Sequence, residues 1–205
     1  MARPKRTQAL ILQFVRREVP ALLSDPQPDH EALADFVRKS NEIEGIVDAA
    51  GSSLYDDHLG VAASVAQVSH RVIQEPLEIH RRLMRSQREH TPGQYRRVWV
   101  SVGGRTCPDP MLVPRLMERL LTKVQFLQRW YSNDPEDRPS EATLWDLHHE
   151  LERVHPFSDG NGRTGRLWLN ALRLHFGYDW LTVDPDEREA YYASIRDYAH
   201  RQNSR

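Results

Sequence analysis

The chain has 205 residues, which is enough for one well-buried domain with a small N-terminal extension. Its formal net charge is −1, which argues against a dedicated nucleic-acid-binding protein, because such proteins are usually basic over a whole face. Cys107 is the single cysteine, so no internal disulfide can form, and we expect a reducing, cytoplasmic location. No apolar run approaches the length of a membrane-spanning helix, so we expect no membrane partner.

Hydrophobic periodicity predicts a mainly helical chain. The first predicted helix lies in the N-terminal extension, residues 1–28, and the rest form one domain, residues 29–205. Asp29 and Ser140 are suited to cap the helices that follow them. The apolar stripe of the helix over 114–131 includes Trp130, which we therefore expect in the core. The predicted helices span residues 9–23, 29–39, 54–75, 76–85, 114–131, 140–154, 167–176 and 187–200.

Residues 95–102 depart from this helical pattern, because they alternate partly and are rich in β-branched and aromatic side chains. Gly103 and Gly104 follow as a hairpin turn, and residues 105–107 form a short return strand. A lone hairpin is only marginally stable, so it must pack on the helices or on a partner. Its free edge either accepts an extended segment of another protein or is a structural edge that faces solvent, and the sequence leaves both readings open.

The stretch that carries most information is His155-Pro-Phe-Ser-Asp-Gly-Asn-Gly-Arg-Thr-Gly-Arg166, which lies directly before an apolar helical run. Each glycine would weaken a helix interior by roughly 1 kcal/mol, so we expect the glycines in a turn before the helix or at its start. Free backbone amides at a helix start favour an anion. Arg163 and Arg166 are three residues apart on the chain, so both can reach the same side.

Three other side chains in this stretch have their own chemistry. Asp159 only accepts hydrogen bonds when ionised and suits a hard cation such as Mg²⁺, which keeps water and binds substrate phosphates. His155 is the one group that can take up a proton near neutral pH. Phe157 is expected to anchor the loop in the core. The stretch therefore predicts a nucleotide-phosphate site with a metal and a base.

A zinc site is the alternative at this place, because His148, His149, Glu152 and His155 lie close together in the sequence. The order His149-Glu150-x-x-Arg153 fails the His-Glu-x-x-His pattern at its last position, which argues against a zinc hydrolase. His148 and His149 are therefore expected to be surface or packing residues.

The stretch resembles the signature of Fic-domain proteins, His-Pro-Phe-x-Asp-Gly-Asn-Gly-Arg-x-x-Arg, and matches it at every specified position. The resemblance covers roughly residues 36–198. It implies a compact helical bundle of the Fic type with one β-hairpin flap, formed by residues 29–205. It also implies a protein adenylyltransferase, an enzyme that transfers AMP from ATP to a hydroxyl of a Ser, Thr or Tyr side chain in a target protein.

The resemblance also implies a role for each matching residue. His155 would be the general base, Asp159 would hold Mg²⁺, and Arg163 and Arg166 would neutralise phosphates. The turn of Gly160, Asn161 and Gly162 would cradle the phosphates.

Two further parts of the site follow from the same resemblance. Tyr191 and Tyr192 are candidate contacts for adenine, although Ala199 stands where many relatives have a base-binding asparagine. The flap would dock the target by strand addition, through Val98, Trp99, Val100, Ser101 and Val102.

A second motif, Ser40-x-x-x-Glu44-Gly45, resembles the family's inhibitory motif. In that family the glutamate pairs with the second signature arginine, here Arg166. A carboxylate on Arg166 would occupy the guanidinium that should meet the γ-phosphate. The resemblance therefore implies inhibition within the same chain.

Alternatives remain at this point. The same site could remove AMP or use another nucleotide, or the chain could be a non-catalytic nucleotide-sensing module, such as one half of a toxin–antitoxin pair. The intact His155 and Asp159 favour the enzyme, because a binding module does not need the base. The target, the oligomeric state and the signal that frees Glu44 are left open.

Overall fold

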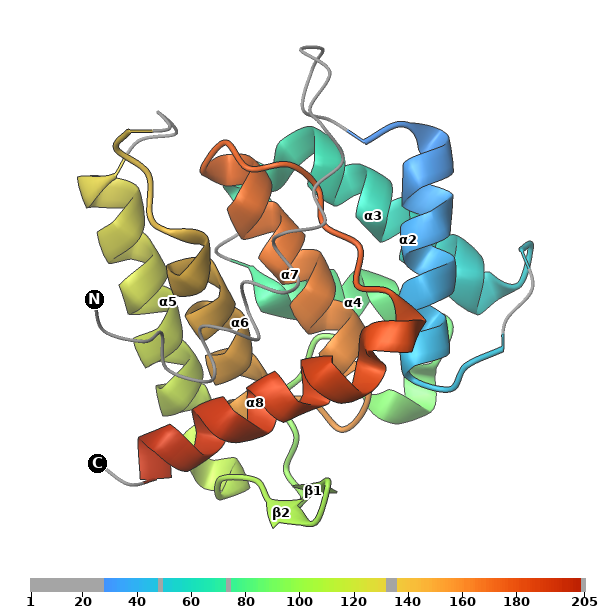
Figure 1. The fold of residues 1–205 in the computed structure, drawn as a ribbon. Helices are drawn as coiled ribbons and strands as arrows, with labels where there is room; N and C mark the ends of the chain where they lie inside the picture. Colours follow the sequence, from blue (N-terminus) through green and yellow to red (C-terminus); the bar gives the residue numbers. More distant parts are fainter. Residues whose placement is uncertain (1–27, 48–49, 73–74, 132–135, 204–205) are drawn as a thin grey trace.

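The computed structural model describes residues 28–47, 50–72, 75–131 and 136–203, and the helix predicted over 9–23 lies outside them. Within these residues the chain forms seven α-helices and one two-stranded hairpin (Figure 1). The mainly helical fold is therefore confirmed. The helices are α2 (His30–Ile43), α3 (Ser53–Val72), α4 (Pro76–Leu83), α5 (Val113–Trp130), α6 (Glu141–Val154), α7 (Asn161–His175) and α8 (Arg188–Asn203), with short 3-10 turns at Arg88–His90, Pro110–Leu112 and Pro185–Glu187.

The predicted caps are confirmed. Asp29 accepts a hydrogen bond from the Ala32 amide at 2.8 Å, and Ser140 accepts one from Thr143 at 3.3 Å. Helix α2 runs to Ile43, further than predicted, and Gly45 ends it with a φ of +73°. The Ser40 to Gly45 motif therefore forms the last turn of a helix and its end.

Helix α7 is the centre of the bundle. It packs on α3, α4 and α6, while α8 packs across α6 (Figure 1). Leu167, Trp168 and Leu172 are fully buried along it. The helix begins at Asn161, earlier than the predicted residue 167, so its first two turns contain glycines and arginines. Packing on three neighbouring helices offsets the weak helix propensity of these glycines.

The predicted long strand over residues 95–102 is wrong. The strands are β1 (Ser101–Val102) and β2 (Arg105–Thr106), paired antiparallel with Val102 opposite Arg105. The reason is Arg96, which is 2% exposed and whose guanidinium donates to the carbonyls of Val98, Pro108, Val154 and His155. These bonds hold the segment before β1 against the end of α6.

Trp130 is not in the core, because 63% of it is exposed. Helix α5 faces α6, and its buried side consists of Met117, Leu120, Val124 and Leu127. Trp130 lies at the outer end of that helix and contacts Phe126, with ring centroids 5.9 Å apart. No helix in the described part of the chain is long and apolar enough to cross a membrane.

Candidate functional site

The turn between α6 and α7 contains two residues with a positive φ, His155 and Gly160. His155 ends α6 in the left-handed conformation, with a φ of +50°, and its amide donates to Leu151 at 2.9 Å. Gly160 precedes α7 with a φ of +70°, and a Cβ there would lie 2.7 Å from the sulfur of Met84. Glycine suits that position, because other residues rarely adopt this conformation and a side chain there would also displace Met84.

Phe157 and His80 pack against each other and hold this turn in place. Phe157 is fully buried, as predicted, and stacks on His80 with ring centroids 3.8 Å apart. His80 Nδ1 accepts the Gly93 amide at 2.9 Å, so Nε2 carries the hydrogen and donates to the Asp159 carbonyl at 3.1 Å. Burial lowers the pKa of His80 to about 4, which keeps this neutral tautomer at neutral pH.

Asn161 is bound within the turn. Its side-chain oxygen accepts the Phe157 amide at 2.9 Å, and its side-chain nitrogen donates to the Phe157 carbonyl at 3.0 Å. The side chain is 2% exposed. In this structure Asn161 therefore shapes the start of α7, and what it can offer an anion is its backbone amide.

Glu44 and Arg166 form the main polar contact of the site. The carboxylate accepts a hydrogen bond from Arg166 Nη2 at 2.7 Å. Arg166 is 2% exposed, and it also donates to the hydroxyl and the carbonyl of Ser40, each at 2.9 Å. Burial alone would lower the pKa of Arg166, but Tyr191 and Glu44 raise it on balance, so the guanidinium stays charged.

Glu44 also lies against the start of α7. A Cβ at Gly162 would be 2.0 Å from the Glu44 carboxylate, so glycine is required for this approach. The first amides of a helix carry partial positive charge and have no partner within the helix. The Glu44 carboxylate therefore occupies a position that favours an anion.

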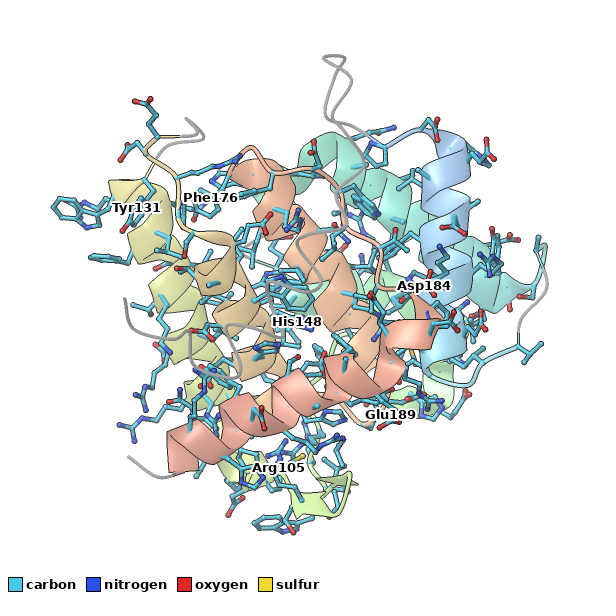
Figure 2. The ribbon with its side chains drawn as sticks, in the orientation of Figure 1. Arg105, Tyr131, His148, Phe176, Asp184 and Glu189 are labelled. Atoms are coloured by element: carbon cyan, nitrogen blue, oxygen red, sulfur yellow. The ribbon has the colours of Figure 1, made fainter. Side chains whose placement is uncertain are left out.

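Tyr191 holds Arg166 from the side of α8. His148 Nδ1 faces the Gly165 carbonyl at 3.0 Å and must donate to it, so Nε2 accepts the Tyr191 hydroxyl hydrogen at 2.9 Å. The Tyr191 oxygen then accepts from Arg166 Nη1 at 3.5 Å. His148 lies in the middle of the bundle (Figure 2) and is fully buried, so it is a packing residue, not a surface residue.

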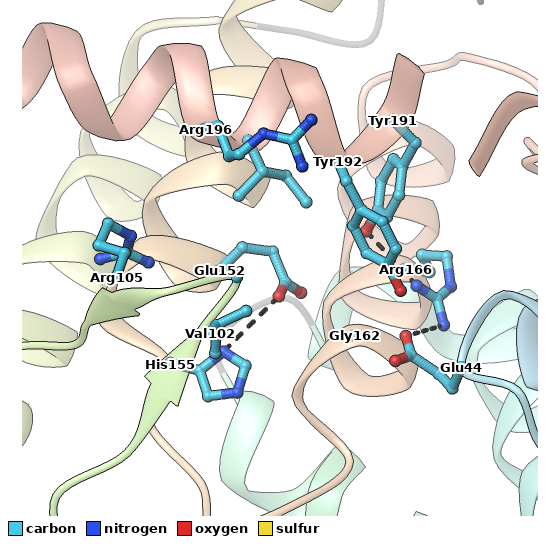
Figure 3. Close-up of a pocket in the computed structure, with 12 residues that line it drawn as sticks. Glu44, Val102, Arg105, Glu152, His155, Gly162, Arg166, Tyr191, Tyr192 and Arg196 are labelled. Carbon is cyan, nitrogen blue, oxygen red and sulfur yellow. Dashed lines mark hydrogen bonds and ion pairs between the residues drawn. The ribbon is translucent and has the colours of Figure 1, made fainter. Parts of the chain in front are cut away.

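These groups surround one cavity of about 290 Å³ (Figure 3). His155, Gly162, Arg166, Tyr191, Tyr192 and Glu44 line it together with Val102 of the hairpin. Burial lowers the pKa of His155 to about 4, so its imidazole is neutral at neutral pH. The structure thus brings the candidate base, one arginine, the glutamate of the predicted inhibitory motif and both tyrosines to a single cavity.

Other predicted site residues do not line this cavity. Asp159 is 48% exposed, and its carboxylate lies 3.8 Å from Arg163 Nη2 and 3.7 Å from His90 Nε2. Arg163 is 1% exposed and contacts the Met84 sulfur at 3.5 Å. Of the five flap residues, only Val102 lines the cavity, while Val98 and Trp99 are 58% and 61% exposed.

Glu152 and Arg96 are among the residues at the site that the sequence did not predict. Glu152 lines the cavity at 6% exposure, and burial together with the Glu44 charge raises its pKa to about 8. Arg96 connects the hairpin segment to the carbonyl of His155 at 2.7 Å. The spacing of three residues between Glu152 and His155 places the two on one helix face, which is the signal in the sequence that points to their contact.

A helical bundle with a glycine-rich start to its central helix, and a hairpin beside one cavity at that start, is the Fic fold. Residues 72–172 match the sequence model of the Fic/DOC family, and the chain contains a Fic domain. The chain is similar to Protein adenylyltransferase Fic of Drosophila ananassae, with 33% identity over 137 residues. That match covers 66% of this chain and 26% of the fly protein, so the chain spans about a quarter of the length of this curated relative.

Solved structures share the fold. A Fic domain containing signaling protein from Bacteroides thetaiotaomicron superposes with a TM-score of 0.68 at 18% identity, over 94% of this chain and 81% of that one. IbpAFic2, solved covalently tethered to Cdc42, superposes with a TM-score of 0.57 at 14% identity, over 97% of this chain and 72% of that one.

Proposed function

We propose that this chain is an autoinhibited protein adenylyltransferase, which transfers AMP from ATP to a hydroxyl side chain of a target protein. The observation that carries the proposal is the Glu44 carboxylate, bonded to Arg166 at 2.7 Å against the first turn of α7. A carboxylate held in this way occupies the place and the arginine that a phosphate group would need. The name of the similar fly protein supports the reaction class.

In the proposed reaction, the hydroxyl oxygen of the target attacks the α-phosphorus of ATP. The bond between that phosphorus and the oxygen bridging to the β-phosphate breaks, and pyrophosphate leaves. His155 takes the hydroxyl proton, for which its buried imidazole is already neutral. Arg163 and Arg166 are charged side chains near the start of α7 and neutralise the phosphates, so most of the catalysis is positioning and charge stabilisation.

Asp159 fits the Mg²⁺ ion that the reaction class implies. Its carboxylate is half-exposed, so a hydrated ion bound to nucleotide phosphates can reach it. No group of three or more His, Cys, Asp or Glu side chains gathers as a metal site within the described residues. Mg²⁺ is usually held by one or two carboxylates, water and substrate phosphates, which suits a single aspartate. The ion would supply charge neutralisation to the phosphates.

The hairpin is the proposed dock for the target protein. Its exposed apolar side chains are Val98, Trp99 and Val102, the last 40% exposed and also lining the cavity. An extended segment paired with β1 would pass beside His155. IbpAFic2 was solved tethered to a protein, Cdc42, which agrees with a protein target. We expect Trp99→Ser to lower transfer to a protein acceptor and to leave ATP binding unchanged.

Removal of AMP is a second candidate, because the Glu44 carboxylate lines the same cavity as His155. There it could orient a water molecule toward an adenylylated target. The two activities respond oppositely to Glu44→Gly, which would abolish removal and raise transfer.

The reaction class is tested with ATP labelled at one phosphate. In extracts of cells that express the Glu44→Gly variant, protein should become labelled from ATP that carries the label on its α-phosphate. It should not become labelled from ATP that carries the label on its γ-phosphate. Label arriving from the γ-phosphate would identify a kinase and overturn the proposal.

A further inference from the structure

Glu152 is a buried carboxyl group at the proposed site that the mechanism above does not use. It lies one helical turn before His155 on α6, and its Oε2 is 4.0 Å from His155 Nδ1 (Figure 3). Its Oε1 has no hydrogen-bond partner within the described residues, although Glu152 is only 6% exposed. Burying a carboxyl with an unpaired oxygen costs free energy, so a functional reason is expected.

The chain makes room for this carboxyl. A Cβ at Gly165 would lie 2.2 Å from Glu152 Oε1 and 3.0 Å from the His148 ring, so any other residue there would displace the carboxyl first. Gly165 stands at a position that the family signature leaves open, and its own φ does not require glycine. The space between α6 and α7 is therefore matched to Glu152.

We propose that Glu152 is a positioning residue for His155: its carboxyl accepts the hydrogen of Nδ1 and thereby leaves the lone pair on Nε2 for the proton of the target hydroxyl. The proposal rests on the proposed function only in assigning His155 as the base. The two atoms are 4.0 Å apart, so a hydrogen bond between them requires that they approach by about 1 Å. Fixing the tautomer through the second ring nitrogen is how carboxylates generally prepare a histidine base.

Several charged groups face this pair. Burial is the main cause that lowers the pKa of His155. The main-chain carbonyl of Glu152 and the Glu44 charge raise it, while Arg96 and Arg105 lower it further. That carbonyl is the competitor for the Nδ1 hydrogen, because it belongs to the last turn of α6. The experiment must therefore separate the side chain of Glu152 from its backbone.

The inhibitory contact acts on the same pair. Burial and then the Glu44 charge raise the pKa of Glu152 to about 8, against the opposing effect of Arg166 and Arg105. Tyr191 faces the same charges, and burial raises its pKa well above the ordinary value, so its hydroxyl stays neutral. When Glu44 leaves, one of the two raising causes disappears, so the carboxyl ionises more readily and can only accept.

The test compares Glu152→Leu with Glu152→Gln, both in the Glu44→Gly background, because glutamine keeps an acceptor oxygen and leucine does not. The ring ¹⁵N shifts of His155, assigned by their loss in His155→Ala, report the tautomer without nucleotide. AMP transfer is measured in parallel as kcat and as KM for ATP. Circular dichroism confirms that both variants fold.

We expect glutamine to preserve the Nδ1–H tautomer and leucine to give a mixture of tautomers. We also expect leucine to lower kcat about 10-fold or more while KM changes by less than about 2-fold. A leucine variant that keeps the Nδ1–H tautomer would overturn the proposal and assign the role to the main-chain carbonyl. Because the ring shifts need no transfer activity, they decide the matter even if no AMP transfer is found.

Gly165→Ala supplies a second variant that leaves Glu152 in the chain. Its new methyl group would displace Oε1, so it should reproduce the tautomer mixture of Glu152→Leu. Retention of the Nδ1–H tautomer in a folded Gly165→Ala protein would contradict the proposal.

Discussion

Glu44 and Arg166 lie 122 positions apart in the sequence, and their side chains meet at 2.7 Å where α2 ends and α7 begins. Arg166 is buried and also donates to the hydroxyl and the carbonyl of Ser40, so loss of Glu44 would leave the arginine with two other acceptors. Under the proposed function, Glu44 is the one charged competitor that a phosphate group must displace from Arg166.

Removing Glu44 should tighten ATP binding. Glu44→Ala takes away both the negative charge and the competitor for Arg166, and coupling of this kind typically changes affinity roughly 5- to 150-fold. Glu42→Ala is the matched control, because Glu42 lies on the same turn of α2, is 54% exposed and pairs with Arg38. Calorimetric titration with a non-hydrolysable ATP analogue measures both variants, and equal affinities would contradict the blocked site.

Tyr191→Phe should destabilise the fold around Arg166. The variant leaves the buried His148 Nε2 without its donor and removes an acceptor from Arg166, which together cost about 1–3 kcal/mol. Tyr192→Phe is the comparison, because it loses one bond to the Ile43 carbonyl at a partly buried position and should cost less. Urea unfolding measures both, and a larger loss for Tyr192→Phe would refute this arrangement.

Arg96→Lys should be costly although it keeps the charge. Lysine cannot reproduce the planar fork that bonds to four carbonyls, and buried acceptors would lose their partners, at about 1–3 kcal/mol or more. Arg97→Lys is the matched control, because the neighbouring Arg97 is exposed. Thermal unfolding should show a drop for Arg96→Lys alone, and similar stabilities would mean that the fork is not needed.

Stability should fall as the pH is lowered below neutral. The pKa values of His80 and His155 are lowered to about 4 and that of His148 to about 3, all chiefly by burial, from an ordinary 6.5. As the pH falls, these histidines therefore take up protons in the unfolded chain before they do so in the folded protein. The stability that each histidine contributes is fully present above pH 6.5. It is lost as the pH falls from 6.5 to the pKa of the folded state, by up to about 1.4 kcal/mol per pH unit.

Glu152 acts in the opposite direction, because its pKa is raised to about 8 and its contribution is lost as the pH rises from 4.5 to 8. The histidines outnumber it, so urea unfolding at pH 5 should give a lower free energy than at pH 7. A higher value at pH 5 would show that these histidines are not held neutral.

Periodicity and cap residues are local patterns, and they predicted the helices and their caps. The meeting of Glu44 with Arg166 was implied by the resemblance to the Fic inhibitory motif, because no local pattern connects residues 122 positions apart. The strand over 95–102 was wrong because Arg96 turns inward to acceptors that are distant in sequence. Glu152 was overlooked for a similar reason, since its burial and the space at Gly165 exist only once α6 and α7 pack together. The side-chain bonds of Asn161 to Phe157 likewise depend on the folded turn.

The most direct test of the account is the intact mass after incubation with Mg²⁺ and ATP. It compares the unmodified sequence, Glu44→Gly, and Glu44→Gly combined with His155→Ala, using the protein as its own acceptor. We predict a gain of the mass of AMP in Glu44→Gly and no gain in the other two. The same gain in all three, or in the His155→Ala combination, would contradict the brake at Glu44 and the base at His155.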